Sequence, residues 1–259
     1  MFDEKSLGLF SFSYDMSILP QVVINAVLGN ITVSMFSRLQ NNRSGTENGF
    51  VHLTFVTSAM VIPVLLSMSL LSEEIVHTIC FFKKNTIWVE SSVLMRWLSL
   101  MGIFYAISVF PSTIWISNKR IVPSILWSCT MFLTTVAAIF SAIKWGIEGI
   151  AIALFIRSAV VFPLFVYINF RITGIKSMAY LKSIYPAFAS GVLVIIPVFA
   201  IKNLIPGISL FRDVAVLLVS ALAGGGIYIF LLRFFSGSLL DPLTDMLRGV
   251  KRKVSFFYR

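Results

Sequence analysis

The sequence has few charged residues: Asp, Glu, Lys and Arg make up only 12% of its 259 positions, whereas a soluble globular domain has roughly 25%. Hydrophobic residues account for 58% of the chain, and the mean hydropathy is +0.91. A soluble fold of this length could not bury so much apolar surface in a single core. The scarcity of charge therefore excludes an ordinary soluble domain and predicts a polytopic membrane protein.

The chain is also poor in residues that bind metals or form disulfides. It contains two cysteines and two histidines, and the positions of Cys80, Cys129, His52 and His77 match no metal-ligand spacing. A disulfide between the two cysteines stays open as an alternative. No Gly-x-x-x-x-Gly-Lys-Ser/Thr motif occurs, so the chain has no Walker-type ATP site of its own. We therefore expect no metal, no cofactor and no enzymatic active site.

Long apolar blocks recur along the chain, and a short polar or basic connector follows each of them. A bilayer core about 30 Å thick takes roughly 20 residues as a helix, and the blocks lack the strict alternation of a β-barrel strand. The sequence therefore predicts an all-α, polytopic transmembrane helix bundle within residues 1–235, with about seven spans. The spans are expected near residues 12–36, 50–71, 94–114, 123–143, 149–170, 184–201 and 214–232.

Two segments outside the spans have a mixed composition. Residues 72–93 combine charged and aromatic side chains, and we expect a helix there, followed by a stretch at the membrane interface. Residues 236–259 interleave apolar residues with basic ones such as Lys251 and Arg252, which predicts a basic amphipathic cytoplasmic tail on an anionic leaflet. A solvated, frayed basic terminus is the alternative for this tail.

The basic residues are divided unequally between the two sides of the predicted bundle. Most of them lie in the first, third and fifth connectors and in the tail, all of which fall on one side when the spans alternate. The positive-inside rule then puts the C-terminus in the cytoplasm and the N-terminus outside. The net charge of +10 is thus explained by the membrane and not by nucleic acid. Residues 1–5 do not resemble a signal peptide. A short acidic N-terminus with Asp3 and Glu4 can be translocated without one, but the simpler expectation is that an upstream part of a longer parent protein is missing.

Arg157 is the most deeply placed ionisable residue, in the middle of the predicted span 149–170. Centring an arginine in a membrane costs roughly 2.5–3.5 kcal/mol on insertion scales. The side chain is therefore expected to face the bundle interior, a partner or a wet cavity. A guanidinium is well suited to bidentate contact with a phosphate. The alternative is a structural role, in which Arg157 reaches the interface or pairs with Glu148 or Asp15.

A polar stripe is predicted on the first span. Ser17, Gln21 and Asn25 recur every four residues, which places them on one slowly drifting face of a helix. Such side chains can line a hydrated path and bind sugar hydroxyls, or they can simply form hydrogen bonds between helices. Asp15, nearer the outer end, is a candidate site for a coupling ion or proton, with an interfacial carboxylate as the alternative.

Several short strings resemble one family in their order and spacing. Each is weak alone because apolar spans match one another easily, and one position departs from the family pattern, with Ser34 in place of a proline. The strings are LGLFSFSY at residues 7–14, LP at 19–20, MFSRLQ at 35–40, KNTIW at 84–88 followed by LMRWL at 94–98, WGIEGIA at 145–151 and RITGI at 171–175. Together they resemble the polysaccharide biosynthesis family of lipid-linked oligosaccharide flippases.

This family includes export proteins for O-antigen, colanic acid and exopolysaccharide, within the superfamily that also holds the multidrug and toxin extrusion transporters. The resemblance implies twelve to fourteen helices in two pseudo-symmetric lobes, of which this chain would be the C-terminal one. It implies a protein of the bacterial inner membrane that moves undecaprenyl-pyrophosphate-linked oligosaccharide by alternating access. Arg157 would then accept the pyrophosphate. The expected partners are the lipid-linked oligosaccharide, membrane lipids, and a missing N-terminal lobe or a homodimer partner.

Three other functions stay open at this point. A drug or cation antiporter of the related extrusion family would be favoured by acidic residues deep in the spans, whereas the deepest ionisable group here is Arg157. A membrane-bound glycosyltransferase or polymerase would need catalytic groups in a substantial outer loop, and the longest such connector, residues 72–93, is short. A truncated half-transporter without activity of its own is the third alternative.

Overall fold

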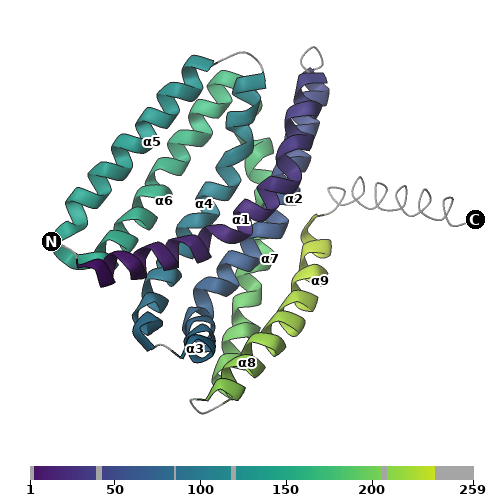
Figure 1. The fold of residues 1–259 in the computed structure, drawn as a ribbon. Helices are drawn as coiled ribbons and strands as arrows, with labels where there is room; N and C mark the ends of the chain where they lie inside the picture. Colours follow the sequence, from purple (N-terminus) through teal and green to yellow (C-terminus); the bar gives the residue numbers. More distant parts are fainter. Residues whose placement is uncertain (1–2, 39–42, 85, 118–120, 206–208, 237–259) are drawn as a thin grey trace, which may run out of the picture.

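The computed structural model describes residues 3–38, 43–84, 86–117, 121–205 and 209–236, and these residues form helices without any strand (Figure 1). The predicted all-α polytopic bundle is therefore confirmed. The tail at 237–259, predicted to be amphipathic, lies outside the described residues. The α-helices are α1 (Glu4–Arg38), α2 (Arg43–Leu70), α3 (Ser72–Lys83), α4 (Ser91–Ser117), α5 (Ile121–Ala142), α6 (Gly146–Thr173), α7 (Ser177–Leu204), α8 (Leu210–Val219) and α9 (Gly225–Ser236).

Six segments of the described chain are long and apolar enough to cross a membrane. One of them, Ile121–Thr173, has 53 residues, which would exceed twice the roughly 30 Å of a bilayer core if it were one helix. It is divided by the 3₁₀ turn η2 (Ile143–Trp145) and by Gly146, whose φ of +75° is accessible to glycine without strain. The segment therefore forms two antiparallel helices, α5 and α6, which gives seven spanning units, as the hydropathy pattern predicts.

The last unit is one continuous rod with a local irregularity. A π-helical turn, η3 (Ser220–Gly224), joins α8 to α9. Gly224 lies in this turn against α7, where an added Cβ would be 3.1 Å from Val198 Cγ2 and 3.4 Å from Val194 Cγ1. A small residue is thus required where this rod approaches α7.

The helices pack in two groups that share one interface. The α4 group consists of α1, α4, α5 and α6, and the α7 group consists of α2, α7, α8 and α9. They meet mainly where α2 packs against α4 and α1, while α6 and α7 touch little although they follow each other in the chain. At this interface Tyr180 of α7 donates a hydrogen bond of 2.6 Å to the carbonyl oxygen of Ile107 in α4.

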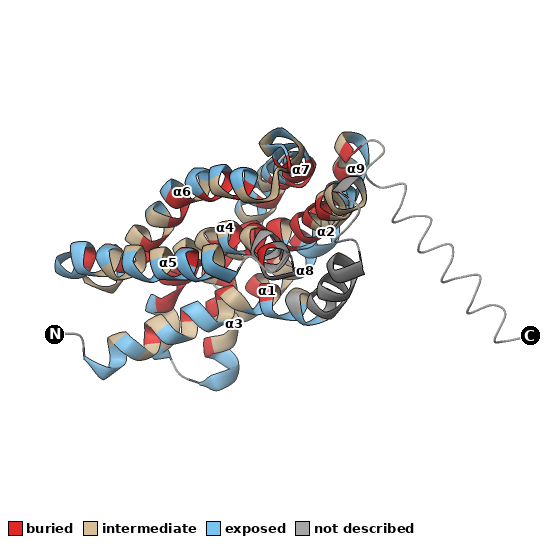
Figure 2. Cartoon of the chain, turned by 90° about the horizontal axis from the view of Figure 1, so that it is seen from above, coloured by how far each residue is buried: buried red, intermediate tan, exposed pale blue. Residues whose placement is uncertain are grey.

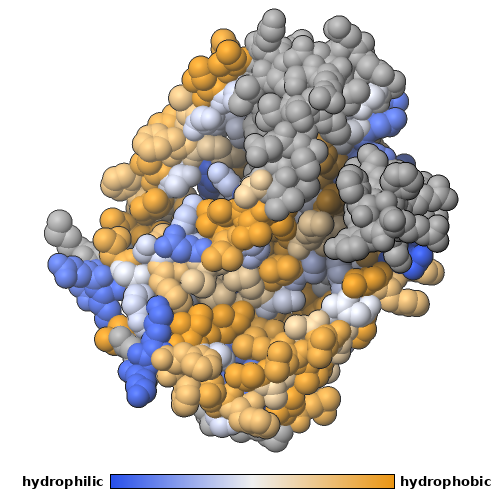
Figure 3. Space-filling view, turned by 45° about the vertical axis from the view of Figure 1, so that its right-hand side comes forward, coloured by the Kyte–Doolittle hydropathy of each residue, from blue (hydrophilic) through white to orange (hydrophobic). Residues whose placement is uncertain are grey.

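Among the described residues seen in Figure 3, apolar side chains predominate and hydrophilic ones form small patches. Helix α5 lies at the edge of the bundle, and only Trp127 and Ala142 are buried in it (Figure 2). Its exposed side chains include Phe132, Leu133 and Phe140. Such a surface would be unstable in water but is suited to lipid. The chain is therefore a multi-pass helical membrane protein.

Helix α3 lies near the lower end of the bundle in Figure 1, beside α8, and is followed by the 3₁₀ turn η1 (Thr86–Glu90). These elements occupy the segment 72–93 that was predicted to start as a helix outside the spans. With 12 residues α3 is too short to cross a bilayer. It ends at Lys84, whose φ of +49° is left-handed and turns the chain back towards α4.

Candidate functional site

Arg157 lies in the middle of α6 and reaches across to α5. Its Nε donates to Thr134 Oγ1 at 3.1 Å, and its Nη2 donates to the same oxygen at 3.0 Å. Nη2 also lies 2.8 Å from the carbonyl oxygen of Met131 and 2.8 Å from its Sδ. All of these acceptors are neutral, so none of them offsets the positive charge of the guanidinium, which is partly buried.

The Thr134 hydroxyl is oriented by its own helix. Its one proton is within reach of two backbone carbonyl oxygens, that of Thr130 at 2.8 Å and that of Met131 at 3.1 Å. Because the proton is donated there, the hydroxyl oxygen faces Arg157 with its lone pairs. One edge of the guanidinium, formed by Nε and Nη2, is consequently fixed on α5.

The other end of the guanidinium has no such partner. Among the described residues no carboxylate lies within 4.0 Å of Arg157, and Nη1 has no hydrogen-bond acceptor. The predicted alternative of an ion pair with Glu148 or Asp15 is thus not what the described chain forms. An uncompensated guanidinium among apolar helices is a favourable place for an anion.

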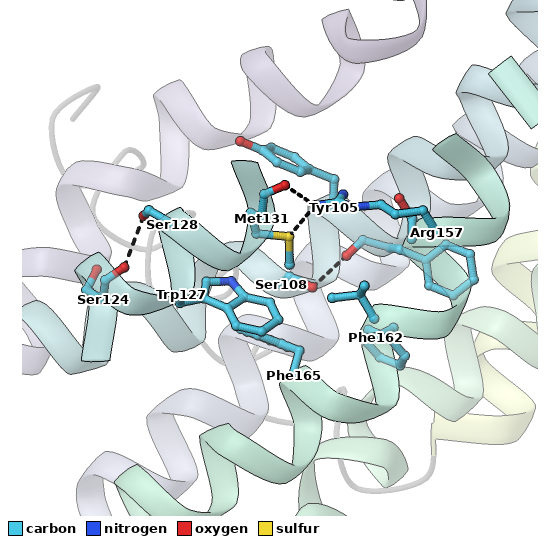
Figure 4. A pocket seen from close by; sticks show the side chains of 12 residues that line it. Tyr105, Ser108, Ser124, Trp127, Ser128, Met131, Arg157, Phe162 and Phe165 are labelled. Atoms are coloured by element: carbon cyan, nitrogen blue, oxygen red, sulfur yellow. Dashed lines mark hydrogen bonds between the residues drawn. The ribbon is translucent and has the colours of Figure 1, made fainter. Parts of the chain in front are cut away.

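Arg157 borders a cavity of about 390 Å³ between α4, α5 and α6 (Figure 4). This volume is within the range of small-molecule sites. Among the described residues that line it, Arg157 is accompanied by aromatic rings and serine hydroxyls and by no other charged side chain. The aromatic residues are Phe104, Tyr105, Trp127, Phe162 and Phe165, and the serines are Ser108, Ser124, Ser128 and Ser158.

Three of these serines have their protons engaged by their own helices. Ser108 donates to the carbonyl oxygen of Phe104 at 2.7 Å, Ser128 to that of Ser124 at 3.0 Å, and Ser158 to that of Leu154 at 2.9 Å. Their hydroxyl oxygens therefore act as acceptors towards the cavity. The wall combines one cation, several acceptor oxygens and several aromatic faces.

The polar stripe of α1 packs against α4. Ser17 Oγ lies 3.2 Å from Ser99 Oγ and 3.4 Å from the carbonyl oxygen of Met95. Gln21 is only 2% exposed, and its Oε1 has no hydrogen-bond partner within the part of the chain that the structure describes. Both side chains are enclosed between α1 and α4. Their contact with a sugar stays a prediction. The side chain of Asn25 lies outside the described part of the structure.

Tyr105 connects the stripe with the Arg157 cavity. Ser17, Gln21 and Tyr14 line a void of about 20 Å³ between α1 and α4, and Tyr105 lines both this void and the cavity. The void is about as large as one water requires, and Gln21 Oε1 offers such a water an acceptor. Tyr105 therefore lies between the predicted site residue Arg157 on one side and Ser17 and Gln21 on the other.

The remaining predicted site residue, Asp15, is exposed on α1, and no cation lies within 4.0 Å of it among the described residues. Its role in ion coupling stays a prediction. No group of three His, Cys, Asp or Glu side chains in the described chain is arranged to hold a metal ion. Cys80 and Cys129 are both free, so the disulfide that was left open does not form.

Residues 1–83 match the family model described as "Polysaccharide biosynthesis protein". The match covers α1, α2 and α3, about a third of the chain, and includes the strings at residues 7–14 and 35–40. Neither the curated proteins nor the solved structures contain a match to the chain. The match supports a membrane protein connected with polysaccharide biosynthesis, and it does not extend to α6 or to Arg157.

Sequence reasoning located Arg157 but missed the residues that surround it. Met131 and Thr134 precede it by 26 and 23 positions and lie on another span, so no local spacing connects them with the arginine. The only available signal was the run of hydroxyl residues Thr130, Thr134 and Thr135 inside an apolar span, which is unusual enough to invite an explanation. Tyr105 and Trp127 carried no signal beyond being aromatic.

Proposed function

We propose that this protein moves a lipid-linked oligosaccharide, carried on undecaprenyl pyrophosphate, across the bacterial inner membrane. The observation that carries the proposal is the guanidinium of Arg157, which is fixed along one edge and has no anionic partner among the described residues. A pyrophosphate supplies the missing negative charge and accepts hydrogen bonds in the plane of the guanidinium. The family match over residues 1–83 supports a substrate from polysaccharide biosynthesis.

The other walls of the cavity suit the sugar end of such a substrate. Serine oxygens can accept hydrogen bonds from sugar hydroxyls, and the rings of Tyr105 and Trp127 offer apolar faces for the C–H surfaces of a pyranose. The cavity of about 390 Å³ is too small for a long glycan, so it would take the units next to the pyrophosphate. No bond is made or broken in this process, which is transport and not catalysis.

In a membrane the open side of the cavity cannot face lipid, because Arg157 is only partly buried and a charged group in hydrocarbon is costly. We infer that a second lobe or a second copy of the chain covers this side and encloses a water-filled path. The distribution of basic residues supports a cytoplasmic C-terminus and an outer N-terminus. The related drug or cation antiporter is disfavoured because no acidic side chain is found among the described residues that line the cavity.

The test measures binding of two defined lipids to the purified chain in detergent micelles by native mass spectrometry. The probes are undecaprenyl pyrophosphate and undecaprenol, which differ only in the charged group. We expect the wild type to prefer the pyrophosphate by at least about tenfold, since one charge-assisted interaction contributes about 1.5–3 kcal/mol. Arg157→Ala should lose this preference, and Arg157→Lys should keep part of it.

The matched control is Arg171→Ala, which removes an exposed arginine from the same helix. This variant should bind both lipids as the wild type does. Equal binding of the two lipids by the wild type, or an unchanged preference in Arg157→Ala, would overturn the proposal.

A further inference from the structure

Two adjacent carboxylates at the start of α3 bind cations on two other helices. Glu73 accepts a hydrogen bond of 3.1 Å from Lys202 Nζ at the end of α7, and Glu74 accepts one of 3.0 Å from Arg212 Nη1 in α8. Lys202 Nζ also lies 3.3 Å from Glu74 Oε2, an ion pair without hydrogen-bond geometry. On the next turn of α3, His77 Nδ1 lies 3.7 Å from Asp213 Oδ2.

Arg212 is the central cation of this seam, the contact between α3 and the end of α7 with the start of α8, and it is anchored on its own side. Arg212 donates from Nε to the carbonyl oxygen of Ile205 at 3.0 Å, from Nη2 to that of Lys202 at 2.9 Å, and from Nη1 to Asp213 at 3.0 Å. These bonds stay within the α7 group. The cation is therefore held by α7 and α8 whether or not α3 is present, and it offers a prepared binding surface for the carboxylates.

The opposite face of α3 is apolar and belongs to the α4 group. Val76 and Cys80 are buried against Met95 of α4, together with the partly buried Phe12 and Met16 of α1. Arg96 of α4 donates to Glu73 at 2.8 Å and positions that carboxylate. Burial of apolar surface holds α3 on α4 and α1. Ile75 of α3 also joins the larger apolar core, but the hydrogen bonds and ion pairs from α3 to the end of α7 and the start of α8 are made by charged groups.

Charges in the seam are balanced. The groups that face one another are Glu73, Glu74 and His77 from α3, Arg96 from α4, Lys202 from α7, and Arg212 and Asp213 from α8. Three carboxylates meet three cations, which leaves no excess negative charge for a bound metal ion. The seam therefore joins two parts of the protein and is not itself a binding site.

We propose that α3 is an ionic latch. It closes one end of the bundle through its ion pairs with α7 and α8. It opens when these ion pairs separate while α3 stays packed on α4 and α1. The physical reason lies in the different cost of opening the two faces. When ion pairs separate into water, hydration of both partners offsets most of the lost attraction. When an apolar contact separates, the exposed surface gains no such compensation. An end of the bundle that must open repeatedly is thus better closed by ion pairs than by apolar contacts.

Two further observations are consistent with a latch formed by α3. Leu71, the single residue between α2 and α3, has non-helical dihedral angles, φ −98° and ψ 19°, so α3 departs from the line of α2 at this residue although helical hydrogen bonds continue on both sides of it. The hydrogen bond from Lys202 also holds the pKa of Glu73 below its ordinary value, although partial burial opposes this shift. Glu73 therefore keeps its negative charge at neutral pH. The latch does not depend on the proposed substrate, so the two proposals can fail separately.

The test is a pair of distance measurements by electron–electron resonance between spin labels. One pair crosses the seam, with labels at Phe82→Cys on α3 and Phe211→Cys on α8, both exposed positions. The second pair connects α3 with the α4 group, with labels at Phe82→Cys and the exposed native Cys129 on α5. Cys80→Ser is introduced in both pairs and Cys129→Ser in the first, so that only the intended sites carry labels.

The perturbation is the double variant Glu74→Gln/Arg212→Gln, which removes one charge of each sign and so keeps the net charge of the seam. Lys202 keeps Glu73 as its partner at 3.1 Å, and Asp213 keeps His77 at 3.7 Å. We expect the α3–α8 distances to lengthen and broaden while the α3–α5 distances stay unchanged. Lys5→Gln is the matched control, because it breaks the exposed Lys5–Glu90 ion pair, which joins α1 to η1 and does not cross the seam. It should change neither distance.

The charges can also be weakened without any substitution in the latch. Raising the salt concentration to about 1 M shortens the Debye length to about 3 Å and should increase the long-distance fraction of the α3–α8 pair alone. If this pair gives one unchanged distance in the double variant and in high salt, the latch is refuted. Equal lengthening of both pairs would also refute it, since α3 would then be leaving α4.

Discussion

Replacing Thr134 by valine tests whether Arg157 is held ready for an anion. The substitution keeps the shape of the side chain but removes the oxygen that accepts from Nε at 3.1 Å and from Nη2 at 3.0 Å. Nη2 keeps the carbonyl oxygen of Met131 at 2.8 Å, whereas Nε is left without an acceptor. Losing hydrogen bonds to a charged group costs about 1.5–3 kcal/mol, so the thermal midpoint of the detergent-solubilised protein should fall.

The effect on ligand binding is smaller and has a different cause. Without Thr134 the guanidinium is free to adopt other rotamers, and immobilising it again on binding costs about 0.5–1.5 kcal/mol. Since 1.4 kcal/mol corresponds to a factor of ten, undecaprenyl pyrophosphate should bind about 2- to 12-fold more weakly. Undecaprenol, which lacks the anion, should bind as before.

Two control variants separate this reasoning from a general loss of stability. Thr134→Ser keeps the acceptor oxygen and should restore both the thermal midpoint and the preference for pyrophosphate. Thr135→Val removes the neighbouring hydroxyl, which donates to the carbonyl oxygen of Met131 at 2.7 Å and does not bond to Arg157; it should leave the preference unchanged. If Thr134→Val prefers the pyrophosphate as strongly as the wild type does, the positioning argument is wrong.

Two further predictions concern stability. Gly191→Ala should destabilise the contact of α7 with α2 by about 1–3 kcal/mol, because the added Cβ would lie 2.8 Å from Leu66 Cδ1. Gly225→Ala is the control and should not destabilise the protein, because its added Cβ meets nothing within 4 Å. Thermal unfolding of the two variants in detergent provides the comparison. Because the pKa of Glu73 is lowered by the hydrogen bond from Lys202, its stabilising effect should be fully present above the ordinary glutamate pKa and lost as the pH falls through the depressed value. Glu73→Gln should therefore lower the unfolding midpoint at pH 7, and the difference from wild type should vanish in strong acid; a difference that persists there would contradict this assignment.

The spanning helices could be predicted from the sequence because their cause is local. A stretch of apolar side chains in a membrane must satisfy its backbone within itself, so composition over a window of residues decides where a helix forms. The helices nevertheless extend beyond the predicted spans, as α1 does by starting at Glu4. Hydropathy measures the apolar part, whereas a helix continues into polar residues as long as its hydrogen bonds are made.

The candidate site was predictable only in part, and Arg157 marks the boundary. Its depth in an apolar span was evident from the sequence, and the need for a special environment followed from that depth. Its partners were not evident, because Thr134 and Met131 belong to a helix that packs on α6 only in the folded bundle. The stripe of Ser17 and Gln21 was placed on one helical face, but its enclosure by α4 depends on tertiary packing.

The ionic latch shows the same limit more clearly. Glu74 and Arg212 are separated by 138 positions, and charge in the connectors was interpreted only as a measure of orientation. The sequence by itself determined that this protein is a helical membrane bundle with one deep cation, since hydropathy and the cost of a buried charge act residue by residue. Only the tertiary structure decided which polar groups meet that cation and which charges join α3 to α7 and α8. The reason is that the partners of a polar group are chosen by helix packing, which brings together residues far apart in the chain.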